Sequence, residues 1–294
     1  MKNNSEGAAF LNDVLMKILP DSVKDDLLID KNSIGDICEI RLRINQRCIA
    51  VCCNREIVGS SIVTKELITR IMSMAMSYSA YAFESNLSQG YLTIKGGHRI
   101  GVGGQVIWED GKVKNFSNIT FLCIRIARQI KGCADNIMNT FLEHGLKHTI
   151  IISPPGCGKT TVLRDAVRQL SDRMRVNVSL IDERSEIAAC VNGIPQNDIG
   201  MRTDVIDGCT KGTAVYMAVR SLSPQIIAMD EIGGSVDVDA VKYSIKSGCI
   251  VVGTAHGSGV DDTDRNLKDI FGKGGFEMAV ILKKYGKVEK CLEL

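Results

Sequence analysis

The sequence predicts an α/β protein in two domains, a smaller α+β domain over residues 1–128 and a larger α/β domain over residues 129–294. Two observations lead to this fold class. In the second region, continuous apolar segments of strand length alternate with segments of helical periodicity, which is typical of a mainly parallel sheet covered on both faces. In the first region, helical patterns are mixed with alternating strands and glycine-rich turns. A chain of 294 residues is long enough to bury two hydrophobic cores.

The first domain is predicted to alternate helices with short strands. LNDVLMKILPDSVKDDLL (residues 11–28) repeats apolar residues at helical spacing and is interrupted at Pro20. DICEIRLRINQRCIAVCC (residues 36–53) alternates polar and apolar residues and predicts two strands that turn at the NQ pair. KELITRIMSMAMSYSAYAF (residues 65–83) predicts a long helix. GYLTIKGGHRIGVGGQVIWEDGKV (residues 90–113) predicts short strands separated by Gly-Gly turns.

Apolar strands and helices alternate in the second domain. The strands are predicted in HTIIIS, RVNVSLID, PQIIAMD and CIVVGTAH, residues 148–153, 175–182, 224–230 and 249–256. The helices are predicted in TTVLRDAVRQL, GTAVYMAVRSL and SVDVDAVKYSIKSG, residues 160–170, 212–222 and 235–248. The tail FEMAVILKKYGKVEKCLEL, residues 276–294, has two strand patterns around YGK and predicts a C-terminal β-hairpin.

Composition and charge narrow the functional classes. Lysine and arginine number 36 against 34 aspartates and glutamates, and aromatic residues make up 5%, so the chain lacks the basic surplus and the stacking side chains of a typical nucleic-acid binder. The 11 cysteines form no C-x-x-C pair. The sequence opens with no signal-peptide pattern, and no apolar run is long enough to span a bilayer. We therefore expect a reduced, cytosolic protein.

The segment IISPPGCGKTTVL, residues 151–163, nearly matches the phosphate-binding loop G-x-x-x-x-G-K-[ST], with Ser153 at the first position. It follows a buried strand and opens a helix, so backbone N–H groups and the helix dipole would face a phosphate. Lys159 would contact the β- and γ-phosphates, and Thr160 would supply a hydroxyl to Mg²⁺. A serine suffices at the first position because that residue only lets the strand turn. The predicted nucleotide-binding residues are Ser153, Pro154, Pro155, Gly156, Cys157, Gly158, Lys159, Thr160, Thr161 and, from a later strand, Asp230.

Polar side chains also follow the neighbouring strands of the predicted sheet. SPQIIAMDEIGG ends a strand at Asp230, which would hold the metal through water, and Glu231, which would polarise the attacking water. The segments IDERSEI and GTAHG contribute Glu183 and His256. The carboxyl ends of parallel strands share one edge, where ligands bind in open α/β sheets. The sequence has no N-K-x-D guanine signature, so ATP with Mg²⁺ is expected in preference to GTP.

The order of these motifs resembles that of the ATPases that power type II and type IV secretion and pilus machines. In those proteins an aspartate box, a Walker B motif with a catalytic glutamate and a histidine box follow the loop on a RecA-like P-loop core. Position by position, Glu183 matches the acidic-box glutamate, Glu231 the Walker B glutamate and His256 the box histidine. The resemblance implies catalytic roles for these three residues, and residues 258–275 do not align with the pattern.

Three segments of the chain narrow the resemblance. EIRLRINQR, GYLTIKGGHRIGVGG and FLCIRIARQIKGCAD are similar to the stage III sporulation protein AA family of spore-forming bacteria, and the likeness runs from about residue 36 to the end. Members are cytosolic ATPases that assist the channel between mother cell and forespore. The resemblance implies a homo-oligomeric ring, a hexamer, which is peripheral to the membrane through membrane-embedded channel proteins and has no nucleic-acid partner. The chain departs from larger secretion motors in Ser153 and in lacking their extra C-terminal helical domain.

Ring ATPases complete each site with a cationic side chain from a neighbouring subunit or domain, because charge builds on the γ-phosphate during hydrolysis. Arg41 and Arg43 share one face of a predicted strand, and the arginine-bearing first domain of the family makes them the first candidates. An arginine on a strand is more often part of a solvated face. The other candidates are Arg99, Arg125, Arg128, Arg202 and Arg220.

Two other functions and one other fold fit parts of the sequence. A nucleic-acid motor can use the same core, but the near-neutral charge and sparse aromatic residues disfavour it. A nucleotide-dependent scaffold would bind ATP with little hydrolysis, and the presence of Glu231 disfavours it. The alternative fold is that of the AAA ATPases (ATPases associated with varied activities). That fold would need a helical lid after the last core strand, where this chain has a strand pattern.

Overall fold

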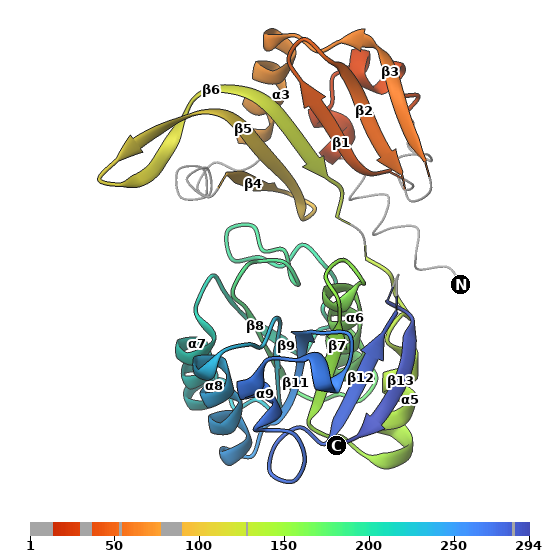
Figure 1. Ribbon diagram of the computed structural model, residues 1–294, viewed down its shortest axis with the longest axis vertical. Helices are drawn as coiled ribbons and strands as arrows, with labels where there is room; N and C mark the ends of the chain where they lie inside the picture. The colour runs from red at the N-terminus through yellow and green to blue at the C-terminus, as the bar shows by residue number, and fades with distance from the viewer. Residues whose placement is uncertain (1–13, 30–36, 53–54, 78–89, 128, 284–285) are drawn as a thin grey trace. The chain divides into compact units, whose positions relative to one another are not determined.

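A computed structural model describes residues 14–29, 37–52, 55–77, 90–127, 129–283 and 286–294 (Figure 1). The chain divides into two compact units. The first comprises Met1–Arg128 with Ala189–Gln196, and the second comprises Gln129–Ala188 with Asn197–Leu294. Each unit contains its own β-sheet with helices, and the predicted α/β class is confirmed.

The first unit is built on an antiparallel six-stranded sheet in the order β3-β2-β1-β6-β5-β4. The strands are β1 (Ile37–Arg43), β2 (Arg47–Cys52), β3 (Glu56–Ile62), β4 (Tyr91–Ile94), β5 (His98–Glu109) and β6 (Lys112–Arg125). The helical residues 14–18, α2 (Asp21–Asp26) and α3 (Lys65–Ser77) share one hydrophobic core with these strands. Buried residues on β2 alternate with more exposed ones, as a sheet with one covered face requires.

Two turn predictions in this unit have different outcomes. The strand pair at the NQ turn is confirmed, with Asn45 in the left-handed region at a φ of 64°. The Gly-Gly turn predicted at Gly103–Gly104 is wrong, because β5 continues through it to Glu109. The register against β6 shifts there, and a Cβ on Gly104 would lie 1.8 Å from the carbonyl oxygen of Asn118. These glycines therefore mark a bulge inside a long strand.

The helix boundaries follow the proline and the limits of the described residues. The predicted break at Pro20 is confirmed, since Pro20 is the residue that precedes α2. Residues 11–13 and 78–83 of the predicted helices lie outside the described residues. The sequence patterns did not predict β3, because its GSSI segment lacks the alternation of a regular strand.

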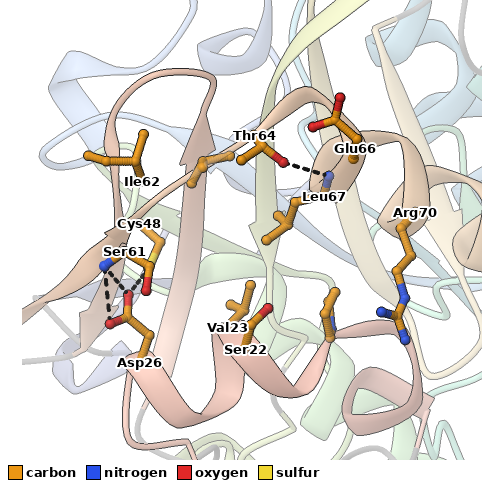
Figure 2. A pocket seen from close by; sticks show the side chains of 12 residues that line it. Ser22, Val23, Asp26, Cys48, Ser61, Ile62, Thr64, Glu66, Leu67 and Arg70 are labelled. Atoms are coloured by element: carbon orange, nitrogen blue, oxygen red, sulfur yellow. Dashed lines mark hydrogen bonds between the residues drawn. The ribbon is translucent and has the colours of Figure 1, made fainter.

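The irregular stretch of β3 is held by a single carboxylate. The Asp26 Oδ1 atom accepts hydrogen bonds from Ser60 N at 2.7 Å and Ser60 Oγ at 2.5 Å, and Asp26 Oδ2 accepts from Ser61 N at 3.0 Å and Cys48 Sγ at 3.0 Å. Figure 2 shows Asp26 at one end of a pocket of about 380 Å³. The hydrogen bonds from Cys48 and Ser60 hold the pKa of Asp26 far below its usual range. A Cβ on Gly59 would lie 2.0 Å from Asp26 Oδ2, so only glycine leaves room for the carboxylate.

The second unit is built on a seven-stranded sheet in the order β13-β12-β7-β11-β10-β8-β9. The strands are β7 (Thr149–Ser153), β8 (Val178–Asp182), β9 (Thr203–Asp207), β10 (Ile226–Met229), β11 (Ile250–His256), β12 (Met278–Leu282) and β13 (Val288–Glu293). All neighbours are parallel except the terminal pair of β12 and β13. Every residue of β7, β8, β10 and β12 is buried, which explains their continuous apolar sequences.

The helices of the second unit follow the predicted alternation with strands. They are α5 (Asp135–His144), α6 (Lys159–Asp172), α7 (Lys211–Ser221), α8 (Ser235–Lys246) and the short α9 (Arg265–Lys268), with a 3₁₀ turn η2 (Val260–Asp262). The helices α7 and α8 lie side by side (Figure 1) and share a core with alternate residues of β7. The sequence patterns missed α5 and the edge strand β9, whose TDVID sequence carries two aspartates.

One segment of the second half belongs to the first unit. Ala189–Gln196 follows β8 in the chain but groups with Met1–Arg128. Gln196 Oε1 accepts a hydrogen bond from Gly96 N at 3.1 Å, and a Cβ on Gly97 would lie 2.8 Å from the Cβ of Ala189. The glycines of the β4–β5 turn therefore make room for this segment.

The Asp26 contacts predict a pH-dependent contribution to stability. A carboxyl whose pKa is depressed in the folded state stabilises that state above its unfolded pKa and loses the contribution as the pH falls. Asp26→Asn should therefore lower the melting temperature at pH 7, and the difference from the parent chain should shrink toward pH 3. The control is Asp25→Asn, because Asp25 is exposed on the same helix. Melting curves by circular dichroism between pH 3 and 7 measure both variants, and an equal effect of the two substitutions would contradict this role of Asp26.

Candidate active site

Parallel strands bring the predicted site residues to one edge of the second sheet. β7, β11, β10 and β8 are consecutive neighbours and run in the same direction. Ser153 at the end of β7 pairs with His256 at the end of β11, and Asp230 directly follows β10. Asp182 ends β8. The convergence predicted from the strand ends is therefore present in the structure.

The loop after β7 has the backbone that its glycines suggest. Gly156 and Gly158 have φ values of 73° and 95°, in the left-handed region that glycine tolerates best. Pro154, Pro155 and Gly156 are exposed, and a Cβ on Gly156 would meet no atom within 4 Å. Gly158 is the N-cap of α6, so the helix begins at Lys159, one residue before the predicted segment. The N-terminus of α6 and its N–H groups thus open onto an accessible loop.

The first loop position does not require glycine. Ser153 is fully buried as the last residue of β7, in an ordinary strand conformation paired with β11. Its hydroxyl donates to the carbonyl oxygen of Pro154 at 3.0 Å, and its own carbonyl oxygen accepts from Lys159. A side chain at this position therefore packs inside the sheet edge and leaves the loop backbone unchanged.

The back of the loop is held by the C-terminal hairpin. Gly286, which precedes β13, donates its N–H to the carbonyl oxygen of Cys157 at 2.7 Å. Its φ is 70°, and a Cβ there would lie 3.0 Å from Val162 Cγ2 on α6. The glycine of the YGK segment thus allows the hairpin to approach both the loop and the first turns of α6.

The lysine of the loop is buried and makes several contacts. The side-chain Nζ of Lys159 lies 2.8 Å from the carbonyl oxygen of Ser153, 3.2 Å from that of Pro154 and 3.1 Å from His256 Nδ1. The residue is 6% exposed. Burial lowers the pKa of Lys159, while the nearby carboxylates of Asp230 and Glu231 act in the opposite direction. A buried ammonium held by weak carbonyl acceptors is well placed to bind an anion.

Asp230 joins three parts of the site. Its Oδ2 accepts from the Thr160 hydroxyl at 3.1 Å, and its Oδ1 accepts from the Thr254 hydroxyl and from Glu231 N at 3.0 Å. Thr160 lies in the first turn of α6 and Thr254 lies on β11. The two predicted magnesium-binding side chains, Thr160 and Asp230, are therefore in direct contact.

Magnesium fits this pair of oxygen ligands. Mg²⁺ prefers oxygen, and in phosphate-transfer sites it takes only one or two protein ligands and completes its shell with water and substrate phosphates. The described residues contain no group of three or more His, Cys, Asp or Glu side chains that would hold a metal alone. The hydroxyl of Thr160 and the carboxylate of Asp230, beside the predicted phosphate-binding loop, match a site in which one or two protein ligands hold the metal.

Glu231 lies in a strained backbone position and its carboxylate has two partners. Its φ is 48°, which is uncommon for a residue other than glycine, and its N–H is held by the Thr254 hydroxyl at 2.9 Å. Its Oε1 lies 3.2 Å from His256 Nε2, and its Oε2 contacts the guanidinium of Arg184. His256 therefore bridges Lys159 and Glu231 through its two ring nitrogens.

The turn after β8 is fixed by a buried carboxylate. Asp182 is 2% exposed and accepts the N–H groups of Glu186, Ile187 and Ala188 at 2.9, 3.0 and 2.8 Å. Burial raises the pKa of Asp182, although the three hydrogen bonds act to lower it. The buried Arg164 of α6 donates to the carbonyl oxygens of Ile187 and Glu186, both at 2.6 Å. This turn is therefore tied to the helix that carries the loop lysine.

Glu183 is paired within the same part of the sheet edge. Its Oε2 lies 2.9 Å from the Nζ of Lys211, at the start of α7. Lys211 Nζ also lies 3.4 Å from Asp237 Oδ2, and Asp237 accepts the N–H of Gly233 at 3.0 Å. The contacts join Glu183 to the segment that follows Glu231.

Similarity to known sequences shows the family to which the chain belongs. A model of the family described as sporulation stage III, protein AA, matches residues 11–293. The chain belongs to this family. The Stage III sporulation protein AA of Bacillus subtilis (strain 168) is 37% identical over 277 residues, which are 92% of this chain and 90% of that protein. Protein SEEDLING PLASTID DEVELOPMENT 1 of Arabidopsis thaliana is 25% identical over 273 residues, 92% of this chain and 37% of that protein.

Solved structures share the fold of this sporulation family at low identity. The ATPase DotB of Legionella pneumophila has a TM-score of 0.58 and 15% identity, and the match covers 88% of this chain and 75% of that one. The pilus retraction motor PilT, solved with bound ADP, has a TM-score of 0.56 and 15% identity, with 85% and 76% covered. At such identities the likeness shows the fold alone. Among the described residues of this family member, no helix is long and apolar enough to cross a membrane.

The arginines named from the sequence make contacts inside their own units. Arg41 pairs with Glu39, and Arg43 lies over the ring of Phe121 at 5.0 Å. Arg99 lies 3.5 Å from the centre of the Tyr91 ring. The roles of Arg41 and Arg43 in hydrolysis stay predictions.

The other candidate arginines either contact residues of their own unit or lie outside the described residues. Arg125 Nε lies 3.6 Å from Glu39 Oε2, and Arg220 of α7 contacts Tyr216. Arg128 lies outside the described residues, and the N–H of Arg202 is bonded to the Ser171 hydroxyl.

Sequence reasoning missed the arginine that the structure brings to Glu231. Arg184 stands inside the IDERSEI segment, whose acidic residues gave the only local signal of a site. The bond of Thr254 to Asp230 depends on the pairing of β10 with β11, which the sequence of the GTAHG segment alone does not show. Lys211 and Arg164 had no local signal, because their partners lie on other elements.

The Asp182 turn yields a prediction about stability. Asp182→Ala leaves three N–H groups of the turn without an acceptor, two of them on buried residues, and each such buried group costs about 1–3 kcal/mol. The free energy of unfolding of the second unit should fall by about 3 kcal/mol or more, whereas Asp182→Asn keeps one oxygen acceptor and should cost less. Exposed Asp239 of α8 provides the control, and Asp239→Ala should change stability by less than about 0.5 kcal/mol. Urea titration followed by circular dichroism measures all three, and equal losses for Asp182→Ala and Asp239→Ala would refute the turn's dependence on Asp182.

Proposed function

We propose that this chain binds Mg-ATP at the carboxyl edge of its parallel sheet and hydrolyses it to ADP and phosphate. The observation that carries the proposal is the contact network Thr160–Asp230, Lys159–His256 and His256–Glu231, which assembles the parts of a phosphoryl-transfer site from three separate elements. Membership of the sporulation stage III protein AA family and the fold likeness to the ATPase DotB support it.

The proposed nucleotide site is the loop of residues 153–161. The backbone N–H groups of the loop and the N-terminus of α6 would hold the phosphates, and the buried ammonium of Lys159 would neutralise the β- and γ-phosphates. Thr160 and Asp230 would hold Mg²⁺, with Asp230 acting through water. The bound metal would neutralise charge that develops on the phosphate oxygens.

Glu231 is the proposed water-polarising carboxylate. It follows β10 at the sheet edge, is held at its N–H by Thr254, and is only partly exposed. His256 would orient it, because the ring contacts Glu231 through one nitrogen and Lys159 through the other. Glu183 is the second candidate carboxylate, and its ion pair with Lys211 supports a positioning role for it.

The proposed context of the reaction is a homohexameric ring that powers or assembles the mother cell–forespore channel during sporulation. Family membership supports the sporulation context, and the fold likeness to a pilus retraction motor supports a motor. In such a ring, Arg41 and Arg43 of one subunit would complete the site of a neighbour. The ring would be cytoplasmic and peripheral to the membrane through its channel partners, and no nucleic acid is expected to bind.

The decisive experiment separates nucleotide binding from chemistry. Glu231→Gln keeps the shape of the side chain but removes its charge, and a water-orienting group acts mainly in the transition state. Phosphate release should fall about 10²–10⁴-fold while the affinity for Mg-ATP does not fall. The ATP-bound variant should also accumulate in the assembled state, visible by light scattering. Asp230→Asn should weaken Mg-ATP binding as well, because Asp230 serves the metal.

The control is Glu143→Gln, because Glu143 is an exposed residue of α5. Binding and phosphate release are measured on all three variants side by side. Hydrolysis by Glu231→Gln at the parent rate would move the catalytic role to Glu183. Binding without measurable hydrolysis by the parent chain would favour the nucleotide-dependent scaffold.

A further inference from the structure

The turn after β8 presents an arginine from a firmly held base. Ser185 has a φ of 53°, its N–H donates to the carbonyl oxygen of Asp182 at 3.2 Å, and its hydroxyl donates to Asp207 Oδ1 at 2.5 Å. Asp182 in turn accepts the three N–H groups that follow Ser185. The backbone around Arg184 is therefore fixed on both sides, while the Arg184 side chain itself is 65% exposed. Only the side chain is free to change partner.

The two charged residues at the apex of this turn have different partners. Glu183 is paired with Lys211, whose side chain is 9% exposed and therefore buried in the edge of the unit. Arg184 instead contacts the carboxylate of Glu231, which is 29% exposed. Apart from the ring of His256, Arg184 is the only basic group paired with Glu231 among the described residues.

A continuous row of polar contacts connects this arginine to the loop lysine. Arg184 contacts Glu231, Glu231 contacts His256 at 3.2 Å, and His256 contacts Lys159 at 3.1 Å. Lys159 is the residue that a γ-phosphate would approach. The guanidinium of Arg184 stands at the other end of this row of three contacts, on the same sheet edge as the loop lysine. Its planar fork of N–H donors matches phosphate oxygens two at a time.

Charge favours an exchange of partners. A terminal phosphate carries more negative charge than one carboxylate and offers three acceptor oxygens. We infer that Arg184 is a γ-phosphate ligand supplied by the same subunit, and that it leaves Glu231 for the γ-phosphate when ATP binds. The exchange frees the carboxylate of Glu231 to hold the attacking water. This inference rests on the proposed ATPase function, and it assigns to Arg184 the recognition of ATP against ADP.

The first test compares two nucleotides by isothermal titration calorimetry on the full chain. The ligands are Mg-ADP and the magnesium complex of the β,γ-imido analogue of ATP, which is not hydrolysed. Arg184→Ala should weaken the analogue about tenfold or more, because one charge-assisted hydrogen-bond pair is lost, and should leave ADP within about twofold. Arg184→Lys should keep part of the preference, since a lysine retains the charge but not the fork. Arg173→Ala at the opposite end of α6 is the matched control and should change neither affinity.

The second test detects the exchange itself in a double-mutant cycle. In the parent, Glu231→Gln removes the competing carboxylate and should tighten binding of the analogue severalfold. In the Arg184→Ala background the same substitution should have no such effect, because the arginine to be released is absent. Both readouts are affinities and do not depend on turnover.

The possible outcomes separate this inference from the proposed function. Equal weakening of ADP and the analogue by Arg184→Ala would mean that Arg184 only supports the fold of the site, and would overturn the inference. Normal nucleotide binding by the parent with no effect of Arg184→Ala would overturn it while leaving the ATPase proposal intact. A parent chain that binds neither nucleotide would overturn both.

Discussion

The carboxylate of Asp230 is the contact on which the candidate site depends. Its two oxygens are shared between the hydroxyls of Thr160 on α6 and Thr254 on β11, while Asp230 itself directly follows β10. The parallel pairing of β10 with β11 brings these groups together, and their side chains then fix the first turn of α6 against the sheet edge. The positions of Lys159 and Glu231 both follow from this arrangement, because Lys159 precedes Thr160 and the N–H of Glu231 is bonded to Asp230.

A second set of contacts ties the turn after β8 to the same helix. Arg164, one turn along α6 from Thr160, holds the carbonyl oxygens of Glu186 and Ile187, and Asp182 holds their N–H groups. The helix that begins at the phosphate loop therefore also fixes the turn that carries Arg184. This turn continues in the chain into Ala189–Gln196, a segment that belongs to the first unit. The turn that carries Arg184 is therefore covalently continuous with a segment of the first unit.

The parts of the fold that were predictable have local signatures. The buried strands β7, β8, β10 and β11 are continuous apolar runs, and the loop, Asp230, Glu231 and His256 stand directly at their ends. The edge strand β9 was missed because its half-buried sequence carries two aspartates and resembles a turn. The turn predicted at Gly103–Gly104 was wrong because a bulge and a turn both favour glycine. The partners of Arg184 and Lys211 lie on other elements, so only the assembled sheet reveals them.

We propose that the contacts at this sheet edge form a site that hydrolyses ATP with magnesium. The most direct measurement is phosphate release by the purified full-length chain with ATP, in the presence of Mg²⁺ and after its removal with EDTA. We expect repeated turnover with Mg²⁺ and loss of phosphate release with EDTA, since Thr160 and Asp230 are proposed to hold the metal. Tight ATP binding with no phosphate release at any Mg²⁺ concentration would contradict it.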